Sequence, residues 1–497
     1  MNFPLDHTIA AIATPLGEGG LAVVRLSGAE AFAVADKSFM PIGKSSLKPS
    51  AAPTHTIHYG KIVHNSQFVD EVMLAVYRAP RTYTREHTVE ITCHGGLLPA
   101  KLVLDALLEN GARLALPGEF TKRAFLNGRL DLAQAEAVTD VIHSQTELAL
   151  AAANEQLAGK LSQRIDQLRD DLMKTLAHIE AHIDFPDEDI APDTKAQLLG
   201  RLERDVAFID ELLRRAPEGQ ILRRGIRAAI VGRPNAGKSS LLNQLLGHDR
   251  AIVSAIPGTT RDTIEETANI RGIPVVFVDT AGLRDTTDEI ESEGVRRSRS
   301  ALARAELILH VLDASEPFTA ADEKYCAEFA GKKRILIRNK IDLPAKLMLP
   351  PEVTESTPHP ALSPPRGEGG RSPGEGSAVG HSAVPAPRPV PGLKIVGVSC
   401  LTAQGIEGLK DAIKNLVWSG EIKAEMLQAM INSRHQDALR RAREATVRTI
   451  EALRNDLSLE LVALDLHIAV NAVGEIVGKT TTEDLLDSIF SQFCIGK

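Results

Sequence analysis

The sequence predicts a multidomain chain. We expect an α+β domain at the N-terminus, an all-α domain formed from two chain segments, and an inserted α/β domain with a doubly wound sheet. Three patterns predict this: short β-rich runs alternate with turns up to about residue 123, apolar residues then recur every three or four positions, and an apolar run leads into a glycine-rich loop and a helix. The 497 residues suit about three domains. The expected bounds are 1–125, 126–222 together with 421–497, and 223–420.

Composition narrows the class of protein. A hydrophobic content of 43% is ordinary for a soluble globular chain, and no run of about 18 apolar residues indicates a membrane span. The first residues lack a basic region followed by an apolar core, so we expect no secretion signal. The net charge of −8 restricts any nucleic-acid contact to a local basic patch. The four cysteines are scattered, which suits a reducing cytoplasm and argues against a disulfide framework or a zinc site: Cys93, Cys326, Cys400 and Cys494.

The sequence predicts an α+β domain for the N-terminal segment. Residues 22–26 and 72–77 are rich in β-branched and aliphatic side chains, so we expect them to be strands. Residues 99–110 have the apolar spacing of an amphipathic helix. The segment therefore combines strands and at least one helix.

The helical segment follows from about residue 130. Apolar residues that share one helix face are Leu157, Leu161, Ile165, Leu168, Leu172, Leu176, Ile179 and Ile183. We expect Pro186 to end this helix and a second helix to span 197–215, with Asp193 as its N-cap. Helical pattern returns from about residue 421. One helical domain built from both flanks, with another domain inserted, is the economical interpretation.

Residues 232–239 match Gly-x-x-x-x-Gly-Lys-Ser between a strand-like run, 227–231, and a helix-like run, 240–246. This context is typical of a loop whose backbone N–H groups bind a polyphosphate at a helix N-terminus. Lys238 would reach the terminal phosphates and Ser239 would ligate magnesium. Asn235 offers a neutral oxygen that can help hold a monovalent cation. A chance glycine-rich turn is disfavoured because the flanking elements are correct.

Three further motifs each follow an apolar run, and together they indicate guanine and GTP. Residues 279–282 (Asp-Thr-Ala-Gly) suit magnesium and the terminal phosphate. In 339–342 (Asn-Lys-Ile-Asp), Asp342 can accept two hydrogen bonds from guanine, and 399–401 would close over the base. Thr260 lies in the segment 254–262 and is a second candidate magnesium ligand. The expected GTP-binding residues are Asn235, Ala236, Gly237, Lys238, Ser239, Ser240, Thr260, Asp279, Thr280, Ala281, Gly282, Asn339, Lys340, Asp342, Ser399, Cys400 and Leu401.

The group that usually positions the attacking water is missing. Leu283 stands where many GTPases of this type carry Gln. Either the domain hydrolyses GTP very slowly or catalysis comes from elsewhere. Carboxylates are abundant in the next segment, although such charges are usually a solvated face: Asp285, Asp288, Glu289, Glu291 and Glu293.

Residues 350–392 are rich in Pro, Gly and Ser and poor in large apolar side chains. We expect a disordered insertion between the Asn-Lys-x-Asp loop and the last strand of the inserted domain. A proline-rich docking site is the alternative, and a tolerated insertion is favoured because long loops cost little closure entropy.

The chain resembles the MnmE (TrmE) family of tRNA modification GTPases. The resemblance covers nearly the whole length except the insertion, and rests on the GTPase motifs and on residues 25–28, 94–96, 118–127, 130–137 and 493–497. The segments 130–137 and 493–497 are the specific ones, whereas a phosphate loop alone is shared by many proteins.

The resemblance implies an activity. Family members act with a flavin-dependent (FAD) partner, MnmG, in a heterotetramer or larger complex, and modify carbon 5 of the wobble uridine of certain tRNAs. The product carries an aminomethyl or carboxymethylaminomethyl group that includes a tetrahydrofolate one-carbon unit. The N-terminal domain would form a cytoplasmic homodimer and bind a 5-formyl-tetrahydrofolate-type ligand through Arg25, Glu86, Arg129 and Lys497. Family members often carry Lys at the position of Arg129, which keeps the charge and changes the geometry.

The resemblance also implies how GTP is hydrolysed. Potassium would be bound by Asn235 with oxygens of Ser254, Ile256 and Thr259, so Ser254 and Thr259 join the expected GTP-binding residues. The ion would take the electrostatic role of an arginine finger as two GTP domains meet across their switch loops. Glu291 would orient the attacking water, and Lys238 would stabilise the transferred phosphoryl group.

Two features and two rival functions stay open at this point. Cys494 either supports chemistry beside the folate site or anchors the tail as a small apolar residue, and prenylation is disfavoured because Lys497 ends the chain. A C-terminal basic stretch either tracks tRNA phosphates or is a solvated helix face: Arg434, Arg440, Arg441, Arg443 and Arg448. The rivals are a ribosome-assembly GTPase of the Era/Der kind, disfavoured by the single phosphate loop and the lack of a KH-like Gly-x-x-Gly context, and a GTP switch without a role in modification.

Overall fold

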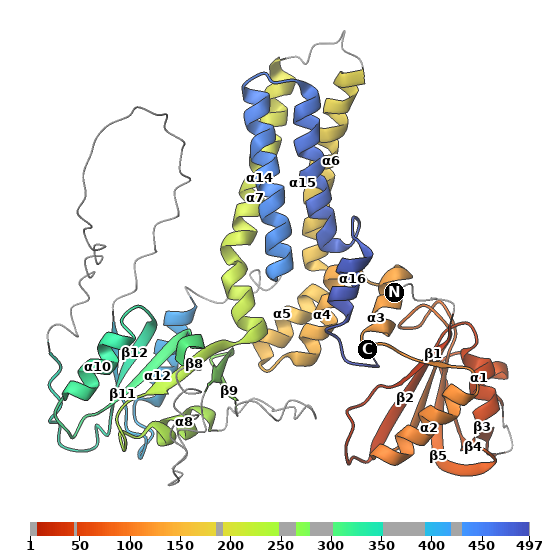
Figure 1. Ribbon diagram of the computed structural model, residues 1–497, viewed down its shortest axis with the longest axis horizontal. Coiled ribbons are helices and arrows are strands. Elements are labelled where there is room, and N and C mark those ends of the chain that lie inside the picture. Colours follow the sequence, from red (N-terminus) through yellow and green to blue (C-terminus); the bar gives the residue numbers. More distant parts are fainter. Residues whose placement is uncertain are drawn as a thin grey trace, which may run out of the picture. The chain divides into compact units, whose positions relative to one another are not determined.

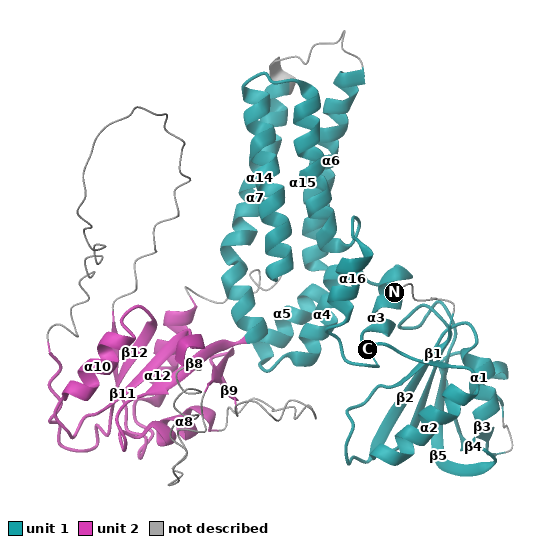
Figure 2. Ribbon diagram, in the orientation of Figure 1, with its two compact units in different colours: residues 1–224, 254–259, 422–497 teal, residues 225–253, 260–421 magenta. Residues whose placement is uncertain are grey.

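A computed structural model describes residues 7–43, 47–184, 192–247, 265–278, 302–350, 393–418 and 430–496 (Figure 1). The chain divides into two compact units, shown in Figure 2. Unit 1 comprises residues 1–224, 254–259 and 422–497, and unit 2 comprises 225–253 and 260–421. Among the described residues, no helix has the length and apolar character needed to cross a membrane.

Unit 1 begins with a seven-stranded sheet of order β3-β4-β5-β6-β2-β1-β7, in which only β1 and β7 pair in parallel. Helices α1 (Ala31–Ser38) and α2 (Leu97–Glu109) belong to this α+β domain, whose core includes Leu26, Leu74 and Val103. The strands are β1 Ile9–Ile12, β2 Leu21–Ser27, β3 Phe39–Pro41, β4 Thr56–His64, β5 Gln67–Tyr77, β6 Thr88–His94 and β7 Arg113–Leu114. The strands expected at 22–26 and 72–77 lie in β2 and β5, and the helix expected at 99–110 lies almost wholly in α2.

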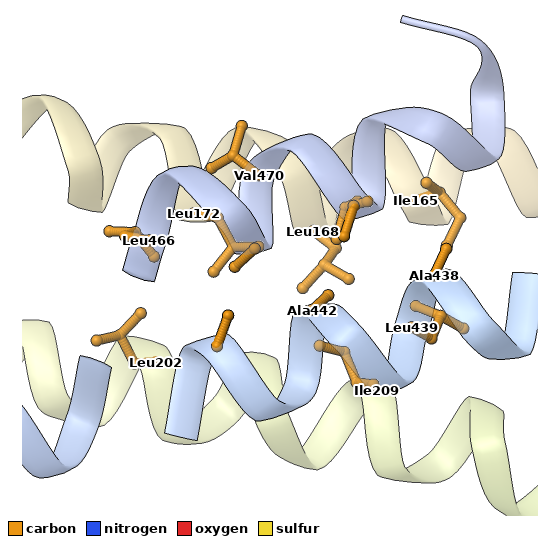
Figure 3. Packing of buried hydrophobic residues seen from close by; sticks show 14 of the residues in the cluster. Ile165, Leu168, Leu172, Leu202, Ile209, Ala438, Leu439, Ala442, Leu466 and Val470 are labelled. Atoms are coloured by element: carbon orange, nitrogen blue, oxygen red, sulfur yellow. The ribbon is translucent and has the colours of Figure 1, made fainter. Parts of the chain in front are cut away.

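The rest of unit 1 is helical. Four long helices, α6 (Lys160–Asp184), α7 (Pro192–Arg224), α14 (Ser433–Arg454) and α15 (Leu459–Val477), share one apolar core although they come from both ends of the chain. Figure 3 shows Leu172 of α6, Ile209 of α7, Leu439 of α14 and Leu466 of α15 within that core. Shorter helices complete the domain: α3 Glu119–Leu126, α4 Leu132–His143, α5 Glu147–Leu157 and α16 Glu483–Phe490.

Two local expectations for the helical segment are wrong. Leu157 ends α5, and α6 begins only at Lys160 because Gly159 adopts a left-handed φ of +83° that breaks the helix. Asp193 does not cap α7, which begins at Pro192. A proline is well tolerated in the first turn, where its missing N–H has no intrahelical partner. The helix expected at 197–215 is thus part of a longer one, while Pro186 lies outside the described residues.

Unit 2 contains a six-stranded sheet of order β13-β12-β11-β8-β10-β9, parallel except for the edge strand β9. Its strands are β8 Ile226–Val231, β9 Glu266–Ile270, β10 Ile273–Phe277, β11 Leu307–Asp313, β12 Lys333–Asn339 and β13 Lys394–Gly397. Val231 and Ile308 pack with Phe329 beyond α10 (Ala320–Glu328). Helices α8 (Lys238–Leu246) and α12 (Ile406–Val417) also pack on the sheet. The predicted doubly wound α/β architecture is confirmed; residues 351–392 of the expected insertion lie outside the described residues.

Candidate functional site

The glycine-rich loop connects β8 to α8 at the carboxyl end of a central parallel strand. Gly232 (φ 147°) and Gly237 (φ 96°) adopt backbone conformations that favour glycine. A Cβ on Gly237 would lie 2.1 Å from Asn339 Nδ2, and one on Gly232 would lie 2.3 Å from the Val311 carbonyl oxygen. A larger residue at either position would therefore clash with β11 or β12 and would also be strained by the backbone conformation of the turn. Asn235 is exposed and has φ 61°.

Lys238 lies over this loop. Its ammonium donates hydrogen bonds to the carbonyl oxygens of Gly232 (3.1 Å) and Arg233 (2.8 Å). Ser239 and Ser240 are exposed in the first turn of α8, where helix N–H groups point toward the loop. The arrangement places one cation, two hydroxyl-bearing residues and a helix N-terminus around the loop, as polyphosphate binding requires.

Asn339 joins the phosphate loop to the segment expected to close over the base. It is buried at the end of β12, donates a hydrogen bond from Nδ2 to the Ala236 carbonyl (2.9 Å), and accepts one at Oδ1 from the Cys400 N–H (3.2 Å). Gln244 of α8 donates to the Cys400 carbonyl at 2.9 Å. The structure thus brings together three of the four predicted motifs.

The remaining residues of these motifs lie around Asn339. Lys340 (φ 63°) forms an ion pair with Asp313 of β11, with 2.5 Å between Nζ and Oδ2. Burial alone would raise the pKa of Asp313, but its hydrogen bonds from Lys340 and Ser315 hold the pKa below its usual value. Asp342 is exposed beyond Lys340. Its carboxylate is therefore accessible to a ligand.

The segment 399–401 presents side chains of three kinds. Ser399 is buried and accepts a hydrogen bond at Oγ from the Thr402 N–H (3.2 Å), whereas Leu401 is 86% exposed. Burial raises the pKa of the Cys400 thiol to about 11, so the thiol is neutral near pH 7. The segment therefore offers backbone groups and an apolar side chain rather than a reactive sulfur.

Sequence reasoning missed the groups that hold the loop in place. Arg233, inside the phosphate motif, forms ion pairs of 3.1 Å with both Glu316 and the buried Asp322. A cation at a variable position of a phosphate motif was the available signal, but its partners lie more than 80 residues away and only the fold identifies them. Asp313 was missed for the same reason.

Many expected site residues lie outside the described residues. They are Ser254, Ile256, Thr259, Thr260, Asp279, Thr280, Ala281, Gly282, Leu283 and Glu291. The expected magnesium and potassium ligand sets and the role of Glu291 stay predictions.

A second candidate site lies in the N-terminal domain around Tyr83. The guanidinium of Arg129 is 4.7 Å from the centroid of the Tyr83 ring, and that of Arg25 is 5.7 Å from it. Arg25 also pairs with Glu90 at 2.8 Å. Beside them is a pocket of about 560 Å³, lined by His55, Tyr77, Pro80, Arg81, Thr82, Tyr83, Arg85, Thr88, Glu90 and Arg129. Of the three expected folate residues that the structure describes, Arg25, Glu86 and Arg129, only Arg129 lines this pocket.

Glu86 is already engaged by protein groups. Both of its carboxylate oxygens lie 3.1 Å from Arg123 NH1, and one accepts a hydrogen bond from Ser27 Oγ at 2.7 Å. Sequence reasoning missed Tyr83 with its neighbours Arg81 and Arg85. Two arginines around a tyrosine directly before Glu86 were a usable signal for an anion-binding pocket.

The described part of the C-terminal tail reaches Arg25 at Gly496. The Gly118 N–H donates to the Cys494 carbonyl at 3.4 Å, and Arg25 NH1 donates to the Gly496 carbonyl at 3.3 Å. Phe493 is buried with Leu132, whereas Cys494 is exposed. The side chain of Cys494 therefore does not serve as a buried anchor; Lys497 lies outside the described residues.

The arginines of the C-terminal basic stretch are bound to protein groups. Arg434 forms a bidentate pair with Glu136, with both N–O distances 2.9 Å. Each of the others has an acceptor on its own or a neighbouring helix: Arg440 with Gln436, Arg441 with Asp437 and Glu475, Arg443 with Asp210, and Arg448 with Asp465. This favours the interpretation as a helix face over a phosphate-binding track.

The doubly wound sheet, its glycine-rich loop and the Asn339 bridge define a P-loop nucleotide-binding protein with helical and α+β domains. The family model described as "GTP-binding protein TrmE N-terminus" matches residues 8–129, and that described as "MnmE helical domain" matches 132–494. The chain belongs to the MnmE family of tRNA modification GTPases.

Similar proteins extend over the whole chain. The tRNA modification GTPase MnmE of Geobacillus kaustophilus is 45% identical over 493 residues, 99% of each chain. That of Geobacillus thermodenitrificans is 46% identical over 494 residues, again 99% of each chain. That of Chloroflexus aurantiacus is 44% identical over 495 residues, which cover 99% of this chain and 100% of the relative.

Proposed function

We propose that this chain hydrolyses GTP in the modification of tRNA, as the names of its relatives state for them. The observation that carries the proposal is the buried Asn339, which bridges the phosphate loop at Ala236 to the base-side segment at Cys400. That bridge would fix the distance between the proposed phosphate site and the proposed base site. Membership of the family over 99% of the chain argues against a ribosome-assembly GTPase.

Guanine specificity would come from Asp342. Its exposed carboxylate would accept hydrogen bonds from guanine N1–H and the exocyclic amine, and adenine offers neither donor at those positions. Asp342→Asn tests this, because an amide matches xanthine, which carries an oxygen in place of the amine. We expect GTP affinity to fall at least about tenfold, the loss of a charge-assisted hydrogen bond, while xanthosine triphosphate gains affinity. Unchanged GTP affinity would remove Asp342 from this role.

Hydrolysis would depend on two kinds of metal ion. Ser239 and Thr260 would bind magnesium, and Asn235 would bind potassium with oxygens of Ser254, Ile256 and Thr259. Asn235 fits this role because it is an exposed residue of the glycine-rich loop and its amide brings no charge of its own. Magnesium and potassium supply positive charge against the transferred phosphoryl group, and Lys238 adds a third cation.

The test compares GTP turnover in potassium and in sodium at equal ionic strength, with stimulation expected from potassium alone. Glu291→Ala should leave GTP binding intact and reduce turnover about a hundredfold, the scale of losing a positioned base. Equal rates in both salts would contradict the potassium site, and near-normal turnover of the variant would remove Glu291 from the mechanism.

The N-terminal pocket would bind a 5-formyl-tetrahydrofolate-type ligand. Three arginines would provide cations for a glutamate tail: Arg81, Arg85 and Arg129. The aromatic ring of Tyr83 would provide a stacking surface. Arg25, Glu86 and Lys497 stay in the proposed set, with Arg25 positioned by Glu90 and the tail. Folate supplies the one-carbon unit for the new group on uridine carbon 5.

Folate binding to the full chain tests this assignment and separates it from a pure GTP switch. Arg129→Ala and Arg25→Ala should each weaken binding by about tenfold or more, since each removes a charged partner. Lys61→Ala, an exposed cation on β4, is the matched control. Equal affinity in all four proteins would contradict the site.

The partners follow from the same proposal. The chain would act in the cytoplasm as a homodimer, together with an FAD-containing MnmG-type flavoprotein and tRNA. Reconstitution of the wobble modification with both proteins, GTP and a folate donor is the direct test. Formation of the product without this chain would contradict it.

A further inference from the structure

Helix α4 has an apolar face that holds the C-terminal tail. Leu132 and Ala135, one turn apart, share a buried cluster with Ile489 and Phe490 of α16 and with Phe493 beyond it. The helix is well anchored at its start, where Asp131 and Gln134 form a capping box. The tail then continues from this cluster to the Arg25 contact at Gly496.

The adjoining face of α4 carries two carboxylates one turn apart, Glu136 and Asp140. Glu136 is 7% exposed; it binds Arg434 through two 2.9 Å hydrogen bonds and lies 2.8 Å from His435 Nε2. Arg434 and His435 lie in the first turn of α14, the first described helix after the chain returns from unit 2. Arg434 also donates to the carbonyls of Glu475 (2.7 Å) and Ile476 (3.0 Å), so it is held on several sides.

Asp140 binds the other chain connection. It accepts a 2.7 Å hydrogen bond from Arg223 Nε, and its side chain is 13% exposed. Arg223 lies in the last turn of α7, two residues before unit 2 begins at Gly225. The outgoing and returning segments also lie side by side, because a Cβ on Gly219 would be 3.3 Å from the Ile431 carbonyl oxygen.

The two faces of α4 therefore connect features that are remote in sequence. One face holds both segments through which the chain enters and leaves the nucleotide-binding unit, and the other holds the segment that ends beside Arg25. Buried charge pairs have few alternative arrangements, since separating them leaves an unpaired charge at high cost. Rigid secondary elements held by packed side chains and ion-pair networks are among the structures that carry coupling between sites.

We propose that Glu136 and Asp140 are positioning residues that couple the nucleotide state of unit 2, through α4, to the placement of the C-terminal tail at Arg25. The inference rests on the proposed function only in requiring that unit 2 binds GTP. It does not depend on folate, on tRNA or on the flavoprotein partner.

Cys494 provides a direct measurement of the tail. It is exposed, whereas Cys93 and Cys326 are buried and the pKa of Cys400 is raised to about 11 by burial. A thiol reagent near neutral pH should therefore modify Cys494 first, and Cys494→Ser gives the background from Cys400 and the buried thiols. The measured quantity is the ratio of Cys494 labelling rates with GDP and with a non-hydrolysable GTP analogue bound.

In the unaltered protein we expect the two rates to differ about fivefold or more, the usual size of coupling between sites. Asp140→Asn should bring the ratio close to one while nucleotide affinity and basal GTP turnover stay within about twofold. Asp210→Asn is the matched control, because it removes a carboxylate that pairs with an exposed arginine, Arg443, on the same bundle. It should keep the full ratio.

Arg223→Gln breaks the same ion pair from the α7 side. Because the Arg223 side chain is one-third exposed, this variant is the substitute if Asp140→Asn does not fold. Arg223→Lys, which keeps the charge, should restore part of the response. Nucleotide binding is measured on the same samples. Absence of binding would reject the proposed function, whereas binding with equal labelling rates, or an unchanged ratio in both Asp140→Asn and Arg223→Gln, would overturn the coupling.

Discussion

Helix α14 carries arginines in two very different environments. The side chain of Arg434 at its start is 16% exposed and bonds to Glu136 and two backbone carbonyls, whereas those of Arg441, Arg443 and Arg448 further along are 44%, 42% and 50% exposed. All have carboxylate partners at hydrogen-bond distance. Desolvation is what separates them, since water screens the exposed pairs and leaves the buried pair without an alternative partner. Mutation should therefore cost much more stability at Arg434 than at the exposed arginines.

The largest difference is expected for Arg434→Ala. Removing it leaves Glu136 buried beside His435 without its bidentate partner, so the free energy of unfolding should fall by about 3–5 kcal/mol. Arg443→Ala, which breaks an exposed pair, should cost about 1 kcal/mol or less. Denaturant unfolding of both variants measures the contrast. Equal losses would show that burial does not distinguish the two arginines.

Buried and exposed carboxylates on α7 offer the next contrast. Asp205 is 6% exposed and its Oδ2 has no hydrogen-bond partner; burial, with Asp171 nearby, raises its pKa to about 7. Because the folded pKa lies above the unfolded one, the stability that Asp205 contributes is complete below about pH 4 and is lost as the pH rises toward 7.

Asp205→Asn, which stays neutral, should therefore stabilise the protein at pH 8 by at most about 4 kcal/mol, at about 1.4 kcal/mol per pKa unit, and change little at pH 4. Unfolding at both pH values is the measurement. Asp210→Asn, whose carboxylate faces Arg443 in solvent, is the control and should show no gain. A gain that is the same at pH 4 and pH 8 would contradict the raised pKa.

Acid should weaken the buried cluster more than the surface pairs. Burial lowers the pKa of His435, so the unfolded chain takes up its proton first and stability is lost as the pH falls below about 6.5. Burial would raise the pKa of Glu136, but the charges and hydrogen bonds of His435 and Arg434 lower it, so its contribution is lost at still lower pH.

The stability advantage of the unaltered protein over His435→Gln should shrink by about 1–2 kcal/mol between pH 7 and pH 5. His467→Gln, at an exposed pair with Glu180, serves as the control; an advantage that widens at pH 5 would contradict the expectation.

The smallest effect is expected on tRNA binding. Arg443 and Arg448 each face a carboxylate, so replacing either by Ala removes a charge that is already neutralised. Affinity for tRNA should change by less than about threefold, with a change in the salt slope well below one. Filter binding over a salt series measures both quantities. A tenfold loss would identify the exposed arginines as phosphate contacts and reverse the comparison.

The sequence was sufficient for features that repeat or follow a local motif. The apolar spacing of α6 and the strand–loop–helix around Gly232 and Lys238 were predictable because short-range geometry determines them. The sequence was insufficient where the environment of a residue depends on partners that are distant in the chain. In the sequence, Arg434 could not be distinguished from the other arginines of α14. Only the fold shows that it pairs with Glu136, almost 300 residues away. Tyr83 and the anchoring of Arg233 depend on similarly distant partners, and Asp193 was misassigned because Pro192 can begin a helix.

The helical core contains residues that the ribosome synthesises at widely separated times. Leu172 of α6 packs in one cluster with Leu466 of α15, about 300 residues later, so at typical rates of synthesis the first half of the bundle waits about 15–60 s for the second. During that interval α6 and α7 lack the apolar partners that α14 and α15 supply to the same core. The nucleotide-binding unit, encoded in between, can finish folding before the bundle that carries it is complete.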